Sequence, residues 1–444
     1  MKLEIIDYGN NGEGIAKLDG KVYFVPGTLV GEIVDAEVTK TKSNFCFCRV
    51  NSIEKTSQDR VQPICQYFGK CGGCNLMHIN EKAQSEIKTR VTQNTINKIS
   101  KLDIKLDNLV TAKTLNYRNK MVFAFNENCD LCMHDIDNKL MPINYCYLEE
   151  EGIEKVTNIV QKFVKNEHLI GYSNFTKKGL LRYLVVRKLN EKFLITLVAT
   201  KANIPNINSL VKMLQKEGLI FGLFVNLNTQ NNSLILTHEF TKIFGIDYID
   251  SEYVTLSGKS IKYTISPESF LQVNNEIKEL IYRRVEQELK GSKTIIDAYS
   301  GAGLMTAIAA SVADQAVGIE IVKSASLDAD RLKMQNNIKN MQNINSDCVV
   351  GLDKVPKSLI NKGLSIILDP PRKGADQAVL NKVLDMKPDK IVYISCNPAT
   401  LARDLITLNN AYDVVSITPY DMFSNTAEVE CFTILKRKGK VDEI

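Results

Sequence analysis

Three side chains near the C-terminus combine a nucleophile with carboxylates. Cys396 ends the apolar run in YISCNP, Asp369 ends another in ILDPPRKG, and Glu428 or Glu430 precedes a third in SNTAEVEC. Ligands of open α/β sheets bind beyond the carboxyl ends of the strands. If these runs belong to one sheet, we expect the thiol and the carboxylates to meet at its edge. The local pattern around Cys396 alone favours a core cysteine, so the surrounding motifs decide its role.

The chemistry that such a set can perform follows from the properties of a thiol. A thiol of ordinary pKa is only about 3% ionised at pH 7, so it needs activation or a strong electrophile. Carbon 6 of a pyrimidine is such an electrophile. Uracil carbon 5 is too weak a nucleophile to accept a methyl group unaided, but a thiolate added at carbon 6 makes carbon 5 enolate-like. A base must then remove the carbon-5 proton so that the thiol can leave. The minimum set is therefore a thiol, a carboxylate and a methyl-donor site.

A site for a nucleotide-type ligand is indicated by TIIDAYSGAGLMTAIAA, which has the order strand, glycine-rich turn and helix start. Gly301 and Gly303 allow a tight turn, and Glu320 ends the next apolar run, where a carboxylate can bind ribose hydroxyls. Thr306 replaces the third glycine of the dinucleotide fingerprint, which favours an adenosine ligand without a pyrophosphate over NAD. Two prolines fix the direction of Asp369, although a rigid turn capped by that carboxylate has the same sequence.

The elements that must position these groups fall into three segments. Residues 1–54 contain short strands with Gly and Asp turns, which predict a small barrel of the oligonucleotide-binding kind or a purely structural β-domain. Residues 55–265 predict an α+β domain, with helices at 81–101 and 206–217 and the strand-like runs MVFAF, YLVVRK, FLITLVA, LFVNL and SLILT. Residues 266–444 alternate helical stretches with apolar runs, which predicts a doubly wound parallel sheet. The expected fold class is thus α/β.

A second chemical feature is the loop CQYFGKCGGC, which contains Cys65, Cys71 and Cys74. Three cysteines at this spacing indicate a metal site that needs a fourth ligand. Two completions remain open on spacing alone. The CxxC pair at 129–132 would make a zinc ribbon with Cys71 and Cys74, whereas Cys146 would complete an iron–sulfur cluster.

Composition narrows the class of protein. The chain has 444 residues, 44% hydrophobic and 24% charged, which suits two or three globular domains. It shows no apolar signal core and no uncharged apolar run of membrane-spanning length, so we expect a cytoplasmic protein with no membrane partner.

Residues 51–120 contain twelve Lys or Arg against six acidic residues, which suits a phosphate-binding face or a solvated helix. Eleven cysteines in a reducing compartment do not indicate disulfides. Four of them are predicted to be core residues: Cys46, Cys48, Cys348 and Cys431.

Taken together, the motifs resemble those of the S-adenosylmethionine-dependent RNA uracil-5-methyltransferases, over nearly the whole chain. The resemblance is carried by a TRAM-like N-terminal barrel and by YRNKMVFAF, GLLRYLVVRK, ISPESFLQVN, DAYSGAG, ILDPPRKG, YISCNPATLARDL and DMFSNTAEVE. The conjunction of DPPR, SCNP and the terminal glutamate is the most specific part. The resemblance implies a TRAM domain at 1–54, a central domain with a cluster loop at 55–265 and a Rossmann-like class I methyltransferase domain at 266–444.

The same resemblance implies roles for individual residues. Cys396 is implied as the nucleophile and Glu430 as the base. Asp369 is implied to orient the uracil edge as well as to contact the methyl donor. The full set implied to contact S-adenosylmethionine is Gln272, Tyr299, Glu320 and Asp369. The rRNA-directed members carry a [4Fe-4S] cluster with this first cysteine spacing and a distal fourth cysteine. This implies a cluster, in preference to zinc, on Cys65, Cys71, Cys74 and Cys146.

Four positions depart from the family pattern. Ser300 stands where the family usually has cysteine, and Leu304 where a polar residue follows the glycine turn. The acidic adenine contact is displaced to Asp353. Glu428 stands where histidine usually precedes the terminal glutamate by two residues, so it either raises the pKa of Glu430 or is merely exposed.

The predicted substrate follows from the N-terminal barrel and the cysteine loop. By this resemblance, family members that have both the barrel and the cysteine loop act on large-subunit rRNA. The predicted substrate is therefore 23S rRNA, with tRNA as the alternative. We expect no DNA partner and a monomeric enzyme. The target uridine must be flipped out of its stack to reach the thiol. Two other classes compete. A non-catalytic RNA-binding assembly factor would have lost the thiol or the base, and both are present. An amino-group methyltransferase would need no thiol.

Overall fold

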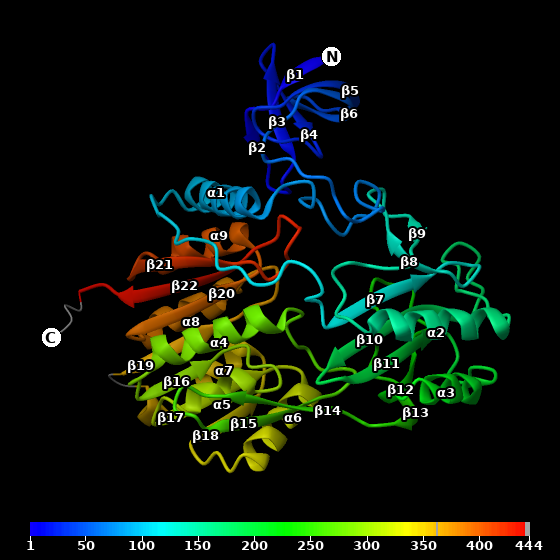
Figure 1. Ribbon diagram of the computed structural model, residues 1–444. Helices are drawn as coiled ribbons and strands as arrows, with labels where there is room; N and C mark the ends of the chain where they lie inside the picture. The colour runs from blue at the N-terminus through cyan, green and yellow to red at the C-terminus, as the bar shows by residue number, and fades with distance from the viewer. Residues whose placement is uncertain (361–362, 440–444) are drawn as a thin grey trace.

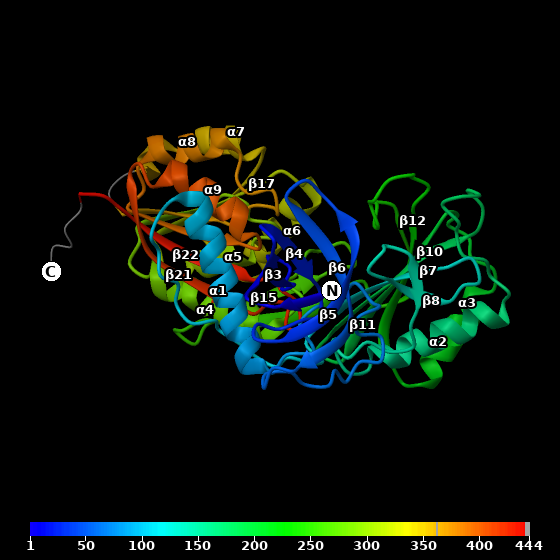
Figure 2. The ribbon, with the colours of Figure 1, turned by 90° about the horizontal axis from the view of Figure 1, so that it is seen from above.

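The structure is a computed structural model that describes residues 1–360 and 363–439. The described residues form three large sheets, which follow one another along the chain, and a separate two-stranded sheet (Figure 1). The N-terminal sheet stands above the junction between the central and C-terminal sheets in both ribbon views (Figures 1 and 2). The predicted fold class, an α/β chain with a small N-terminal β-domain, is confirmed.

The N-terminal sheet has the strand order β1-β5-β6-β4-β3-β2. Asp19 and Gly20 join β3 to β4 with φ angles of 49° and 74°, as a two-residue hairpin turn requires. Val25, Val34 and Cys46 lie in its core. The strands are β1 (Lys2–Glu4), β2 (Asp7–Tyr8), β3 (Gly14–Leu18), β4 (Lys21–Val25), β5 (Ile33–Thr41) and β6 (Phe45–Lys55).

The central sheet has the order β13-β12-β11-β10-β7-β8-β9, and helices α2 and α3 pack on it through a shared apolar core. Cys129 is buried in that core. The elements are β7 (Lys120–Phe125), β8 (Leu131–His134), β9 (Leu140–Pro142), α2 (Ile153–Asn166), β10 (Leu181–Leu189), β11 (Lys192–Ala199), α3 (Ile207–Lys216), β12 (Ile220–Leu227) and β13 (Phe240–Gly245).

One predicted strand of this region, SLILT at 233–237, is wrong. Asn228 Nδ2 donates to the carbonyls of Leu234 (2.7 Å) and Ile235 (3.0 Å), and Asn226 Nδ2 donates to the carbonyl of Thr237 (3.0 Å). Asn226 of β12 and Asn228, which follows this strand, therefore satisfy backbone groups that a strand partner would otherwise bond. The segment joins no sheet.

The C-terminal sheet has the order β18-β17-β16-β19-β20-β22-β21, with β22 antiparallel to both of its neighbours. Helices α4, α5 and α6 share one apolar core with the sheet, and α7, α8 and α9 share another, so both faces are covered. The elements are α4 (Asn275–Leu289), β16 (Thr294–Asp297), α5 (Leu304–Ala310), β17 (Gln315–Glu320), α6 (Lys323–Gln335), β18 (Met341–Asn345), α7 (Cys348–Lys354), β19 (Leu364–Leu368), α8 (Gln377–Met386), β20 (Lys390–Ser395), α9 (Pro398–Leu408), β21 (Tyr412–Tyr420) and β22 (Glu430–Arg437).

Two segments that precede residue 266 pack on this C-terminal sheet. Helix α1 (Glu81–Ser100) lies against α9, and its Ile96 joins the same core as Leu106 and Leu405. The two-stranded sheet of β14 (Ile249–Val254) and β15 (Ser260–Ile265) joins the core beneath α4 and α5. Among the described residues, no helix is both long enough and apolar enough to cross a membrane.

Candidate active site

The thiol of Cys396 lies in a tight turn between β20 and α9. Asn397 is the helix N-cap, and its Oδ1 accepts a hydrogen bond from the amide of Ala399 (3.1 Å). Its Nδ2 donates to the carbonyl of Arg372 (3.2 Å), which ties the turn to the loop that follows Asp369. The sequence SCNP therefore fixes the thiol relative to the DPPR loop.

Glu430 begins β22, opposite the end of β20. Ser395 pairs with Cys431 in the antiparallel ladder, so Cys396 and Glu430 are the next positions in register. Side chains opposite each other in such a ladder have Cβ atoms about 5 Å apart. Glu430 is 2% exposed and Cys396 is half-buried. The structure thus brings the predicted nucleophile and the predicted base together.

Burial and like charges control protonation at this edge of the sheet. Burial raises the pKa of Glu430 well above its usual value, and Asp369 and then Glu428 raise it further. Burial, followed by Asp297, raises the pKa of Asp369 to about 7. Burial and the carboxylate of Glu430 raise the pKa of the Cys396 thiol to about 11. The raised pKa of the thiol favours its protonated form in the free protein, and the raised pKa of Glu430 makes this carboxylate a stronger base than an exposed one.

Glu428, the position that departs from the family pattern, is partly exposed and forms an ion pair with Arg372 (2.6 Å). Its carboxylate contributes to the raised pKa of Glu430, which agrees with the first of the two alternatives. Arg372 favours the ionised form of Cys396 and so opposes the carboxylates. The DPPR loop thus supplies a cation that lowers the pKa of the thiol.

A two-lobed cavity opens beside these groups, at the carboxyl ends of β16, β17 and β19. Its larger lobe has a volume of about 590 Å³. Tyr299 and Asp369 line both lobes, Gln272 lines the smaller lobe, and Glu320 lines the larger. Across the two lobes the lining contains seven carboxylates and two lysines. We call it the acidic cavity.

The carboxylate chemistry of the acidic cavity suits a cation with hydroxyl groups better than a phosphate. Glu320 is held by the amides of Gly301 (2.9 Å) and Val322 (2.7 Å). Asp297 is 1% exposed, and its Oδ1 has no hydrogen-bond partner among the described residues, whereas Oδ2 accepts from Thr306 (2.7 Å). The cavity therefore fits S-adenosylmethionine, which carries a sulfonium, an ammonium and a ribose.

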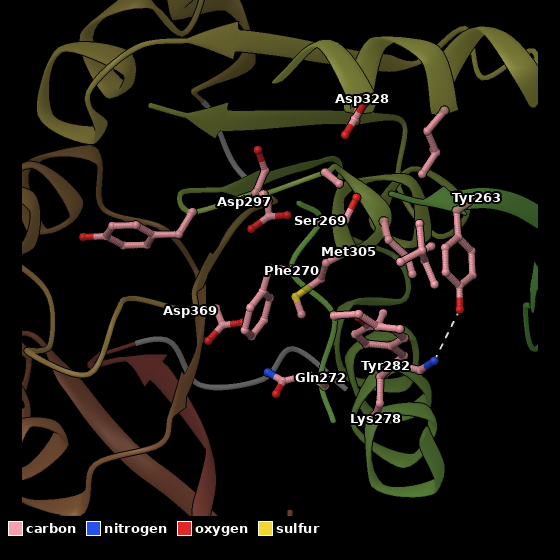
Figure 3. Close-up of a pocket in the computed structure, with 18 of the residues that line it drawn as sticks. Tyr263, Ser269, Phe270, Gln272, Lys278, Tyr282, Asp297, Met305, Asp328 and Asp369 are labelled. Carbon is pink, nitrogen blue, oxygen red and sulfur yellow. Dashed lines mark hydrogen bonds between the residues drawn. The ribbon is translucent and has the colours of Figure 1, made fainter. Parts of the chain in front are cut away.

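The segment after β15 closes this cavity. Figure 3 shows Phe270 and Gln272 at the same end of the cavity as Asp369, with Lys278 and Tyr263 at the other end. Asn119, which is fully buried, holds the segment in place because its Nδ2 donates to the carbonyl of Gln272 (2.9 Å). A residue next to β7 of the central sheet therefore positions one wall of the cavity.

The expected acidic contact at Asp353 is misplaced. Asp353 is ion-paired with Lys382 on the surface and does not line the acidic cavity. Asp347, the N-cap of α7, lines it instead. The signal was present in the sequence, since an Asp that precedes a helix is a typical N-cap at the end of a strand.

A buried lysine supports the loop that carries Glu430. Lys88 of α1 is 2% exposed, forms an ion pair with Asp421, and donates to the carbonyls of Phe423 (3.1 Å) and Glu428 (3.1 Å). Leu76, from the cysteine loop, donates its amide to the carbonyl of Asn425 in the same loop (3.0 Å). Neither contact is evident from the sequence, because the partners lie more than 300 residues apart.

Replacing Lys88 with methionine is expected to lower the free energy of unfolding by about 3 kcal/mol, because Asp421 loses its buried partner. Lys98→Met on the same helix, where the side chain is exposed, should change it by less than about 0.5 kcal/mol. Urea denaturation measures both, and hydrogen exchange of residues 421–430 should accelerate only in the first variant. Equal effects of the two substitutions would contradict this assignment.

The four predicted cluster cysteines line one cavity, beneath the N-terminal sheet: Cys65, Cys71, Cys74 and Cys146. Burial, followed by the thiols of Cys146, Cys71 and Cys65, raises the pKa of Cys74 to about 12, which indicates that the four are neighbours. The CxxC pair at 129–132 is buried elsewhere, in the central core. In the described chain, no three His, Cys, Asp or Glu side chains are arranged to hold a single metal ion. All eleven cysteines are free, and the four predicted to be core residues are buried.

The combination of a doubly wound sheet and an acidic cavity beside its strand ends defines a methyltransferase. Residues 359–438 match the family model described as tRNA (Uracil-5-)-methyltransferase, and residues 2–50 match the TRAM domain. The chain belongs to the S-adenosylmethionine-dependent RNA uracil-5-methyltransferase family.

Relatives match over almost their full length. An uncharacterized RNA methyltransferase of Caldanaerobacter subterraneus subsp. tengcongensis is 33% identical over 98% of both chains. One of Clostridium acetobutylicum is 30% identical over 99% of this chain and 97% of its own. The fold is similar to that of the tRNA (uracil-54, C5)-methyltransferase of Pyrococcus abyssi, solved in complex with S-adenosyl-L-homocysteine. The TM-score is 0.78 with 22% identity, over 98% of this chain and 100% of the other.

Proposed function

We propose that this protein methylates carbon 5 of a uridine in RNA through a covalent bond between Cys396 and carbon 6. The observation that carries the proposal is the register of β20 and β22, which puts Cys396 and Glu430 opposite each other beside Asp369. An amino-group methyltransferase has no use for a thiol at this point. A binding factor has no use for a buried carboxylate whose pKa is raised.

The chain's residues carry out three steps. The Cys396 sulfur loses its proton to a neighbouring carboxylate and bonds to carbon 6, while the electron pair of the C5–C6 double bond moves toward the carbon-4 carbonyl. When bound, S-adenosylmethionine supplies the methyl group that carbon 5 accepts. Glu430 then takes the carbon-5 proton, the C5–C6 double bond re-forms, and the Cys396 sulfur is expelled.

The acidic cavity prepares these steps through its charge. Asp369 has a pKa of about 7 in the free protein because of burial and Asp297. A sulfonium beside it favours the carboxylate and lowers that pKa. Binding of the methyl donor therefore leaves Asp369 ionised, and we assign contacts with the donor to Gln272, Tyr299, Glu320 and Asp369.

Binding of S-adenosylmethionine at pH 6 is expected to release a fraction of a proton, up to about one, because Asp369 is protonated before binding and ionised after it. S-adenosylhomocysteine lacks the sulfonium charge and should release fewer protons. Below pH 7 the affinity for the methyl donor should thus rise with pH. Isothermal titration calorimetry in two buffers of different ionisation enthalpy measures the release.

The matched control is Asp376→Asn, because Asp376 lines the same cavity but is exposed and paired with Lys373 (3.2 Å). Asp369→Asn should abolish the difference between the two ligands, and Asp376→Asn should preserve it. Equal proton release by both ligands in the unmodified protein would contradict the proposal that Asp369 contacts the methyl donor.

We propose 23S rRNA as the substrate, with tRNA as the second candidate. The TRAM domain, the cysteine loop and the basic segment 51–120 support an extended RNA footprint. The similar Pyrococcus abyssi enzyme, whose name specifies tRNA uracil-54, keeps the tRNA candidate open. Release of tritium from 5-³H-uridine in 23S rRNA and tRNA transcripts distinguishes them. Donor-dependent release from rRNA alone supports the proposal, and release from tRNA alone overturns the substrate.

We also propose that Cys65, Cys71, Cys74 and Cys146 hold a [4Fe-4S] cluster. Four thiols that line one cavity suit this cluster, in which each cysteine binds a different iron and the sulfurs need not meet at one point. Its chemistry here would be structural, since the loop contacts the Glu430 loop through Leu76.

After anaerobic reconstitution, we expect about four iron and four sulfide per chain. Cys146→Ser should lose most of both, and Cys129→Ser, in the separate pair, should lose neither. Retention of the full iron and sulfide content by Cys146→Ser would overturn the ligand set.

A further inference from the structure

A second large cavity lies between the central sheet and the segment after β15. It has a volume of about 490 Å³, part of which the proposed cluster would fill. The four cysteines line one side, and Arg118, Lys120 and Arg187 also line it. No described Asp or Glu does so. We call it the cationic cavity, and it differs from the acidic cavity in the sign of its charge.

Arg187 has no counter-charge in this structure. It is 2% exposed, and Nη2 donates to the carbonyl of Ser269 (2.8 Å), but Nε and Nη1 have no partner among the described residues. Arg187 pairs in register with Lys120 on the neighbouring strand β7, which brings two cations together. Burial, followed by Arg187, lowers the pKa of Lys120 to about 8. Such an arrangement is costly unless an anion completes it.

Arg182, another buried arginine of the same strand, has several partners. It is 5% exposed, and its Nη1 donates to Asn228 Oδ1 (2.9 Å) and to the carbonyl of Gln230 (2.6 Å), while its guanidinium lies 4.9 Å from the Tyr172 ring centre. Arg187 differs, because two of its nitrogen atoms are buried without a partner among the described residues and its side chain lines a cavity.

Lys120 and Arg187 lie on paired strands of the central sheet, whereas the four cysteines lie in loops. The iron content of an Arg187 variant therefore distinguishes a separate anion from the cluster.

The position of the cationic cavity indicates what that anion is. Phe270 is 78% exposed and lines both the cationic and the acidic cavities, so a ligand in one lies next to a ligand in the other. Tyr145 and Tyr183 also line the cationic cavity and offer rings on which a base can stack. A phosphate with an adjacent base fits this combination of two cations and aromatic rings.

We propose that the cationic cavity binds a nucleotide next to the target uridine, with its backbone phosphate held by Arg187 and Lys120. The inference rests on the proposed function in one respect, namely that the bound nucleotide belongs to the same RNA strand as the target uridine. Arg187 thus contributes to RNA affinity and takes no part in the methyl transfer itself.

The test measures binding of a fluorescein-labelled dodecauridylate to the full-length reconstituted protein as a function of KCl concentration. Arg187→Met should bind about tenfold more weakly, and the slope of log K against log salt should fall by about 0.7, the value for one lost phosphate contact on a single strand. Lys120→Met should reproduce both changes. The melting temperature of Arg187→Met should be unchanged or higher, because an unpaired buried charge is removed.

Arg182→Met is the matched control, since the same substitution on the same strand removes an arginine with several partners. It should lower the melting temperature and leave the salt slope as it is. The proposal is overturned if Arg187→Met and Lys120→Met keep the wild-type affinity and slope, or if Arg187→Met loses iron together with RNA affinity, which would assign the cations to the cluster. Methylation is measured separately by tritium release, so an absence of methylation leaves this binding result intact.

Discussion

Replacing Cys396 with alanine is expected to abolish methyl transfer, with a loss of at least about 10⁴-fold in tritium release. Uracil carbon 5 is not nucleophilic enough without addition at carbon 6, and no other described thiol occupies this sheet edge except Cys431, which is fully buried in the core. Binding of S-adenosylmethionine should persist, because Cys396 lines neither lobe of the acidic cavity.

The control for this substitution is Cys48→Ala, which removes a buried thiol from the N-terminal sheet. Its activity should stay within a few-fold of the unmodified protein. If Cys396→Ala methylates RNA at a rate comparable to that of the unmodified protein, the thiol is only a core residue. That result would favour an amino-group methyltransferase instead.

Replacing Glu430 with glutamine should have the second largest effect, a loss of about 10²–10⁴-fold in turnover. The substitution leaves addition and methylation possible but removes the base that takes the carbon-5 proton. A covalent protein–RNA adduct should therefore accumulate as a band of retarded mobility on a denaturing gel. Glutamine should be tolerated by the fold, because it has the shape of glutamate, and burial and Asp369 already disfavour the charged form of Glu430.

Glu428→Gln provides the comparison, since Glu428 is partly exposed and paired with Arg372. We expect no accumulated adduct and only a modest change in rate. Accumulation in Glu428→Gln but not in Glu430→Gln would exchange the roles of the two carboxylates.

Much of the catalytic edge was predictable because its groups follow strands of one sheet. The apolar runs before Asp369 and Cys396 are β19 and β20, and their carboxyl ends meet as parallel neighbours must. Glu430 was harder to place, because β22 is antiparallel to β20. Its first residue, and not its last, therefore lies at the catalytic edge of the sheet. The choice between Glu428 and Glu430 came from family resemblance, and the structure adds a physical difference, since Glu428 is partly exposed and Glu430 is buried.

The parts that the sequence did not predict depend on long-range contacts. Lys88 appeared as one charge on a polar helix, yet it is buried and bound to the Glu430 loop. Arg187 appeared as a residue of a strand-like run, and nothing local shows that its donors are unpaired. The strand predicted at 233–237 is wrong for a related reason, because the side chain of Asn228, just after β12, donates hydrogen bonds to its backbone carbonyls. Local patterns describe elements well, whereas the partners of buried polar groups emerge only in three dimensions.

The most direct test of the central claim uses RNA in which 5-fluorouridine replaces uridine, incubated with the protein and S-adenosylmethionine. Fluorine at carbon 5 cannot be removed as a proton is, so the reaction should stop at the methylated adduct. Mass spectrometry of the digested complex should then find the peptide that contains Cys396 joined to a nucleotide carrying both fluorine and the added methyl group. A complex attached through any other residue, or no complex with an RNA that the protein demonstrably methylates, would contradict the account.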